Sequence, residues 1–74
     1  MVPTKSDPKW GKFMGSLATI QVTDLSTRMM LNRLKMRVSF DHSEAARQKA
    51  IGEAYDFFLK NQANLKDDIK QIFG

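Results

Sequence analysis

The sequence lacks cysteine and contains a single histidine, so two common supports of very small domains are unavailable. Without cysteine there are neither disulfides nor thiolate metal sites, and one histidine cannot build a zinc site unaided. A chain of 74 residues forms one small domain, which buries only about 60% of the surface that its unfolded form exposes. We therefore expect no metal and no cofactor, and we expect helix packing and association with another chain to supply the stability.

Long apolar runs are also absent. Large apolar residues occur at most three in a row, at 29–31 and at 57–59, whereas a membrane span needs about 20. The N-terminal stretch MVPTKSDPKW has no apolar segment of the kind that a secretory signal contains. We therefore expect a soluble cytoplasmic protein without a membrane segment.

The usual signatures of catalysis are missing as well. The sequence contains no P-loop, GxGxxG, GxSxG or HExxH pattern and no cysteine nucleophile. His42 is the only side chain that, unperturbed, titrates near neutrality. No residue in the sequence suggests an oriented partner for it as a general base, so we expect a protein that is not an enzyme.

What the sequence does have is positive charge, and it is unevenly placed. Residues 1–37 contain seven basic and two acidic side chains, a net charge of +5, whereas residues 38–74 contain five basic and six acidic side chains, a net charge of −1. A basic half favours an anionic partner, either an acidic protein surface or a nucleic acid. A basic surface without any partner is an equally good interpretation of the charge alone.

We expect a disordered tail over residues 1–5 and a single small domain over residues 6–74. The domain begins with a helix-start signal, in which Ser6 or Asp7 caps the helix and Pro8 occupies its first turn. The apolar residues that follow fall at helical spacing and are expected to be buried: Trp10, Phe13, Met14 and Leu17.

Residues 18–40 contain a strand-like pattern, then a helical one, then a second strand-like pattern. Residues 18–23 (ATIQVT) are rich in β-branched side chains and alternate apolar with polar positions, which is typical of a short strand. Thr23 or Asp24 can then cap a helix over about 24–35. Residues 34–40 (LKMRVSF) alternate again, and we interpret them as an extended segment that can pair with 18–23 as a two-stranded β-ribbon.

The alternative is one helix over residues 24–40. At about 100° per residue, such a helix has one apolar side with Leu34 at its centre and a second, nearly opposite side that runs from Leu25 to Phe40. It can bury the first side in its own core and offer the second to a partner. This hypothesis gives the candidate partner-binding residues, which are apolar and basic: Met29, Met36, Phe40, Arg28, Arg33, Lys35 and Arg37.

The C-terminal half contains the longest regular pattern. Apolar positions recur at alternating spacings of four and three, as in a coiled-coil seam, with Gln62 as the only polar member. We interpret residues 42–73 as one long helix that follows a capping box from Asp41 to Glu44; in the alternative, Asn64 caps a separate last helix. The seam, expected to be a core or dimer contact, consists of Ile51, Tyr55, Phe58, Gln62, Leu65, Ile69 and Ile72.

The expected fold is mainly α, a small helical domain with a long C-terminal helix (42–73) and a short two-stranded β-ribbon (18–23, 34–40). An α+β hairpin packed on the long helix is the alternative. Because methionine adapts to irregular surfaces, we expect an adaptor or regulatory protein-interaction module that forms a homodimer or docks on an acidic protein. The alternative function is a nucleic-acid-binding module that uses the same arginines with Lys9, Lys12 and Trp10.

Overall fold

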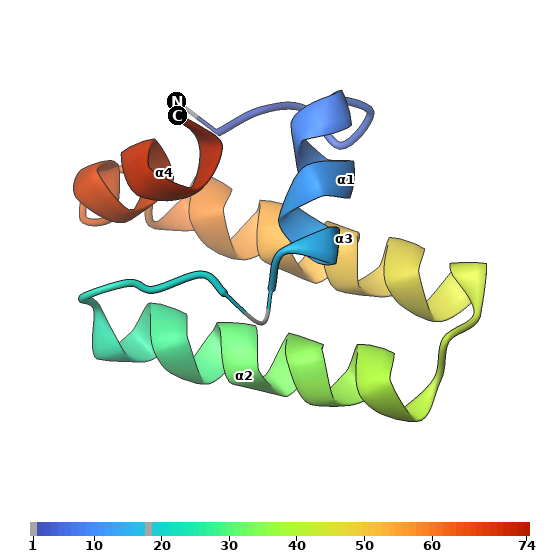
Figure 1. The fold of residues 1–74 in the computed structure, drawn as a ribbon. Helices are drawn as coiled ribbons and strands as arrows, with labels where there is room; N and C mark the ends of the chain where they lie inside the picture. Colours follow the sequence, from blue (N-terminus) through green and yellow to red (C-terminus); the bar gives the residue numbers. More distant parts are fainter. Residues whose placement is uncertain (1, 18) are drawn as a thin grey trace.

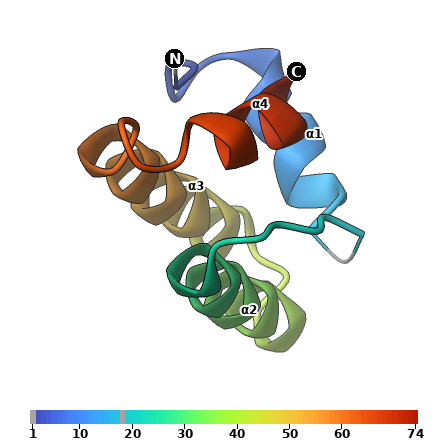
Figure 2. The same cartoon turned by 90° about the vertical axis from the view of Figure 1, so that its left-hand side faces the viewer.

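The computed structural model describes residues 2–17 and 19–74, which form four α-helices and no strand. The helices are α1 (Pro8–Gly15), α2 (Leu25–Phe40), α3 (Glu44–Lys60) and α4 (Lys66–Phe73). The longer two, α2 and α3, are antiparallel neighbours, and α1 and α4 contact each other over one side of α3 (Figure 1, Figure 2). Within the described residues, none of these helices has the length and apolar character that a membrane crossing requires.

Short polar side chains cap the N-termini of three of the helices. The carboxylate of Asp7 accepts the backbone N–H of Lys9 at 2.9 Å, and Asp24 accepts that of Thr27 at 2.9 Å, which confirms the two predicted caps. The predicted box at Asp41 is wrong, because α3 is capped by Ser43 instead. Asp41 belongs to the end of α2, where its backbone N–H bonds the carbonyl of Arg37 at 3.0 Å.

The predicted β-ribbon is wrong for the described residues. Residues 34–40 are the last part of α2, and residues 19–23 have no regular structure, while residue 18 lies outside the described part of the chain. In a helix, residues four apart share one face, so Leu34 is fully buried and Val38 packs against the same core. The helix also bonds its own backbone, whereas a ribbon of two short strands is marginal.

The predicted single helix over 42–73 is also wrong, because the chain turns between α3 and α4. Asn61 ends α3: its side-chain amide donates to the carbonyl of Phe57 at 2.9 Å, and its own carbonyl accepts the N–H of Leu65 at 2.9 Å. Asparagine favours such turns over helix interiors because its side chain competes for the backbone. The alternative of a separate last helix is confirmed, but its predicted cap at Asn64 is wrong, because the residue that precedes α4 is Leu65, without a side-chain cap.

The turn at 61–65 brings the end of the chain back onto α1. There Phe73 lies 4.7 Å from the ring of Trp10, measured between ring centroids, at an angle typical of edge-to-face contacts. We call the four mutually packed rings the aromatic cluster; all are buried, and they are Trp10, Phe13, Phe58 and Phe73.

Two further contacts hold the ends of the chain on this core. The indole N–H of Trp10 donates to the carbonyl of Pro3 at 3.0 Å, and Val2 is buried, so the residues just before α1 lie against the helices. Asp68 of α4 is buried and accepts the backbone N–H and the hydroxyl of Thr23 at 3.3 and 3.2 Å. These bonds satisfy polar groups that burial would otherwise leave unpaired.

Candidate functional site

One side of α2 carries large apolar side chains that nothing in the described chain covers. We call it the outer face of α2, and it consists of four residues that are 60–85% exposed: Leu25, Met29, Met36 and Phe40. Isolated exposed apolar residues are normal. Here four lie on one side of one helix as two pairs, Leu25 with Met29 and Met36 with Phe40, and the exposed Asn32 and Arg33 separate the two pairs. This is the second apolar side that the helical interpretation of residues 24–40 predicts.

Packing of the opposite side of α2 against the core keeps the outer face directed to solvent. Thr27, Met30, Leu31 and Leu34 are buried against α3 and the segment that precedes α2. The Thr27 hydroxyl donates to the Asp24 carboxylate at 3.0 Å, which satisfies a fully buried polar group and holds the first turn. Because this packed side cannot rotate away from the core without exposing Leu34, the outer face stays turned to solvent.

The four basic residues of α2 are not equivalent. Arg33 and Lys35 are exposed, and Arg28 is exposed although its Nε donates to the carbonyl of Val22 at 2.6 Å. Arg37 is half-buried, and its Nη1 lies 2.7 Å from a carboxylate oxygen of Glu53 on α3, too far off line for a hydrogen bond but close enough for an ion pair. Arg37 therefore joins α2 to α3, and the other three border the outer face.

The seam residues lie mostly in the core of the same chain. Ile51, Phe58, Leu65 and Ile69 are buried, and Tyr55 and Ile72 are half-buried against them. Gln62 is exposed in the turn between α3 and α4. Burial of these side chains within one chain leaves little apolar surface along the seam for a second copy.

Of the residues proposed to bind nucleic acid, the basic ones on α1 are exposed and the aromatic ones are buried. Lys9 and Lys12 are exposed on α1, but Trp10 and Phe13 are buried in the aromatic cluster. A ring must present its face to solvent to stack on a base. Trp10 and Phe13 therefore cannot stack on a base in this fold, whereas Phe40 on α2 is exposed.

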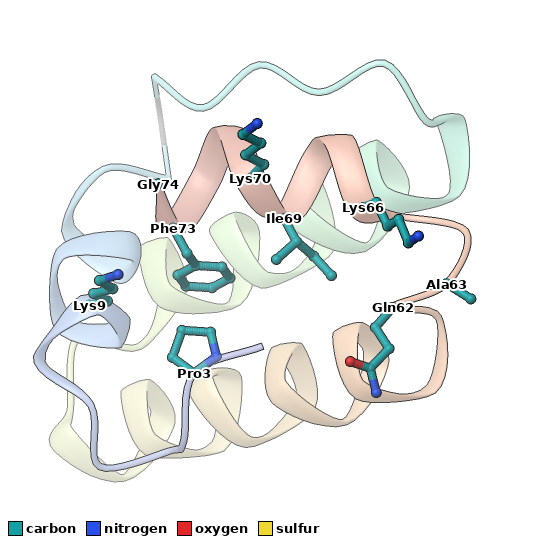
Figure 3. A pocket seen from close by; sticks show the side chains of 9 residues that line it. All are labelled: Pro3, Lys9, Gln62, Ala63, Lys66, Ile69, Lys70, Phe73 and Gly74. Carbon is teal, nitrogen blue, oxygen red and sulfur yellow. The ribbon is translucent and has the colours of Figure 1, made fainter. Parts of the chain in front are cut away.

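A cavity of about 620 Å³ lies between α4, the turn before it and the residues that precede α1. The side chains of Pro3, Ile69 and Phe73 are at its centre. Lys9 and Lys66 lie at opposite ends of the cavity, and Lys70 lies above it with its ammonium group directed away from Pro3 (Figure 3). Among the described residues, no group of acidic or histidine side chains comes together as a metal site would require. The cavity is thus apolar inside and basic at its edge.

A scan against protein-family models and searches of curated proteins and of solved structures find no match to this chain. Sequence reasoning missed the cavity, because its residues come from three separate segments that only the fold brings together. Lys66 and Lys70, four positions apart on an amphipathic helix, were the one local signal that a basic edge is present.

Proposed function

We propose that the chain is a cytoplasmic, non-enzymatic interaction module that docks on an acidic protein surface through the outer face of α2. The observation that supports this is the set of four exposed large apolar side chains on one side of α2 from Leu25 to Phe40, here called the apolar stripe. It extends over about 22 Å at 1.5 Å per residue. A groove or helix that buries such a stripe is a common mode of protein recognition.

The bordering charges favour one kind of partner. Arg28, Arg33 and Lys35 are exposed along the stripe, and α2 contains no acidic side chain between its caps. Two copies that meet through this face place like charges against each other, which opposes association. A partner with an apolar ridge between aspartate and glutamate side chains complements both features, and its charges speed the encounter.

The experiment is a selection from a library of helical peptides with randomised exposed positions, using immobilised protein as bait. Counter-selection uses the double variant Met29→Glu plus Met36→Glu, which should keep its helical circular dichroism and thermal midpoint because both side chains are exposed. We expect enriched peptides to combine an apolar ridge with acidic flanks and to bind the variant at least about tenfold more weakly, a difference of about 1.4 kcal/mol.

A matched control distinguishes loss of the apolar face from the effect of added negative charge. The variant Asn64→Glu plus Gln71→Glu adds the same negative charge at exposed positions outside α2, and we expect it to bind the selected peptides like the unmodified protein. Peptides that bind all three proteins equally, or a double variant that unfolds, would contradict the proposal.

Self-association and nucleic-acid binding are the competing outcomes. Light scattering at several concentrations should show a monomer; a dimer that Met29→Glu plus Met36→Glu abolishes would make a second copy the occupant of the face. Nucleic-acid binding retains the support of the basic half of the chain, and it should weaken steeply with salt, with a log–log slope of about 0.7–0.9 per phosphate contacted. A gel-shift series on DNA and RNA at low salt tests it.

A further inference from the structure

We infer that the cavity between α4 and the residues preceding α1 binds a small apolar carboxylate, with the apolar part on Ile69 and Phe73 and the carboxylate at the edge that carries Lys9, Lys66 and Lys70. This site is separate from the outer face of α2 and does not depend on the function proposed for that face. Its volume of about 620 Å³ lies within the range of about 300–1,000 Å³ that small-molecule sites occupy.

The apolar centre of the cavity is held in place by the core. Phe73 and Ile69 are almost fully buried, so only a small part of each side chain faces the cavity. Phe73 is packed on three rings of the aromatic cluster, and Pro3 is held by the bond from the Trp10 indole. A ligand that enters therefore meets a surface that is already formed, which keeps the entropic cost of binding low.

The edge of the cavity selects the charge of the ligand. Lys9, Lys66 and Lys70 line it and no acidic side chain does, and among the described residues none of the three lysines forms an ion pair. Of the acidic residues of α4, Asp68 is bonded to Thr23, and Asp67 lines a separate hollow beside Thr23 that Lys70 also borders. An anion in the cavity thus meets lysines with no acidic side chain in the lining beside them.

The same groups favour a single carboxylate attached to an apolar body. The ammonium groups of lysines act as point charges rather than as the planar fork of an arginine. The apolar centre rewards burial of a hydrocarbon part by about 25 cal/mol per Å², which a bare inorganic anion cannot supply. Both an aliphatic chain and an aromatic ring fit this description, so both belong in the test.

The test is a titration of ¹⁵N-labelled protein followed by NMR amide shifts. Octanoate supplies the aliphatic carboxylate and 2-naphthoate the aromatic one, while octylamine and 1-octanol keep the octyl chain but change the charge. We expect octanoate, 2-naphthoate or both to shift the amides of α4 and the indole N–H of Trp10 with a dissociation constant in the millimolar range or below. Octylamine and 1-octanol should bind at least about tenfold more weakly.

Paired variants identify the lysines. Lys66→Gln plus Lys70→Gln should weaken binding of the carboxylate at least about tenfold, whereas Lys49→Gln plus Lys60→Gln, which removes the same charge from exposed positions on α3, should leave it unchanged. Lys9→Gln removes the third lysine from a different helix, and a smaller loss of affinity is expected from it.

Several results would overturn the inference. They are no shift at 20 mM of either carboxylate, shifts scattered over the whole surface, equal binding of octylamine or 1-octanol, or equal loss of affinity in the two lysine pairs. The variant Met29→Glu plus Met36→Glu should bind octanoate normally, so failure of this site and failure of the proposed docking face are distinguishable.

Discussion

The aromatic cluster and the outer face of α2 contain similar side chains at opposite levels of exposure. Phe73 is 8% exposed in the cluster, whereas Phe40 is 85% exposed at the end of α2. The helices of the cluster fold back on one another. In the described part of the chain, α3 is the one helix that packs extensively on α2, and it covers the opposite side. The contribution of an apolar side chain to stability therefore depends less on its residue type than on whether its side of the helix is covered by another element.

The largest expected effect comes from a matched pair of phenylalanines. Phe73→Ala should cost about 3–5 kcal/mol of unfolding free energy, because it removes a ring from a close-packed cluster and leaves a cavity. Phe40→Ala should change that free energy by less than about 0.5 kcal/mol, as at other exposed positions. Urea unfolding followed by circular dichroism measures both; a similar loss in the two variants would show that Phe40 is covered in solution.

Two adjacent methionines test the same contrast within one helix. Met30 is 4% exposed and Met29 is 65% exposed. We expect Met30→Ala to cost about 2–5 kcal/mol and Met29→Ala less than about 0.5 kcal/mol, again from urea unfolding. If Met29→Ala were the more damaging of the two, the assignment of the inner and outer faces of α2 would be wrong.

The link between α2 and α3 contains the cap of α3. Ser43 caps α3 by accepting the backbone N–H of Ala46 at 3.2 Å. Ser43→Ala should cost about 1 kcal/mol, and Ser43→Asp, which retains a capping oxygen, should cost less. Thermal unfolding of the two variants side by side gives the difference, and equal midpoints would mean that the cap contributes nothing.

The smallest expected effect is on the loss of stability at acidic pH. Chiefly the backbone N–H of Ser43, at 2.9 Å, and then its hydroxyl lower the pKa of the Asp41 carboxyl from its ordinary value. A lowered pKa in the folded state stabilises the fold above the ordinary pKa, and that stabilisation is lost as the pH falls through the lowered value. Asp41→Asn should therefore make the loss of stability in acid slightly shallower.

The Asp41 carboxyl can also be followed directly. NMR titration of its carbon should give a pKa below the ordinary value in the intact protein. In Ser43→Ala the pKa should rise part of the way, because the hydroxyl is lost while the backbone N–H remains. An unchanged pKa in that variant would exclude a contribution from the hydroxyl.

Much of the helical organisation could be predicted from local sequence. The caps at Asp7 and Asp24 are set by side chains that bond their own first turn, so no distant contact is needed to recognise them. The two apolar sides of α2 follow from periodicity, provided that the helix extends to Phe40. What the sequence could not decide was that extension, because LKMRVSF alternates over only seven residues and its helical state depends on packing against α3.

Distant contacts also explain the other errors. The spacing from Ile51 to Ile72 is regular on either side of Asn61, so periodicity does not reveal the turn there. Asn61 ends α3 by its own bonds, and the contact of Phe73 with Trp10 holds α4 against α1. Apart from the pair Lys66 and Lys70, the cavity has no local signal, since Pro3 and Lys9 lie at the other end of the sequence from α4. Local sequence patterns predict where a helix begins, whereas the residue at which it ends depends also on its tertiary contacts.

The aromatic cluster also has a consequence for the order in which the protein folds. Its rings come from near opposite ends of the sequence, whereas α2 and α3 are consecutive and joined by the short link 41–43. Closing a long loop costs more entropy than closing a short one, and distant contacts form slowly. We expect the α2–α3 hairpin to form early and the cluster late, so that substitutions in the cluster mainly accelerate unfolding. Stopped-flow fluorescence of Trp10, the sole tryptophan, follows that late step.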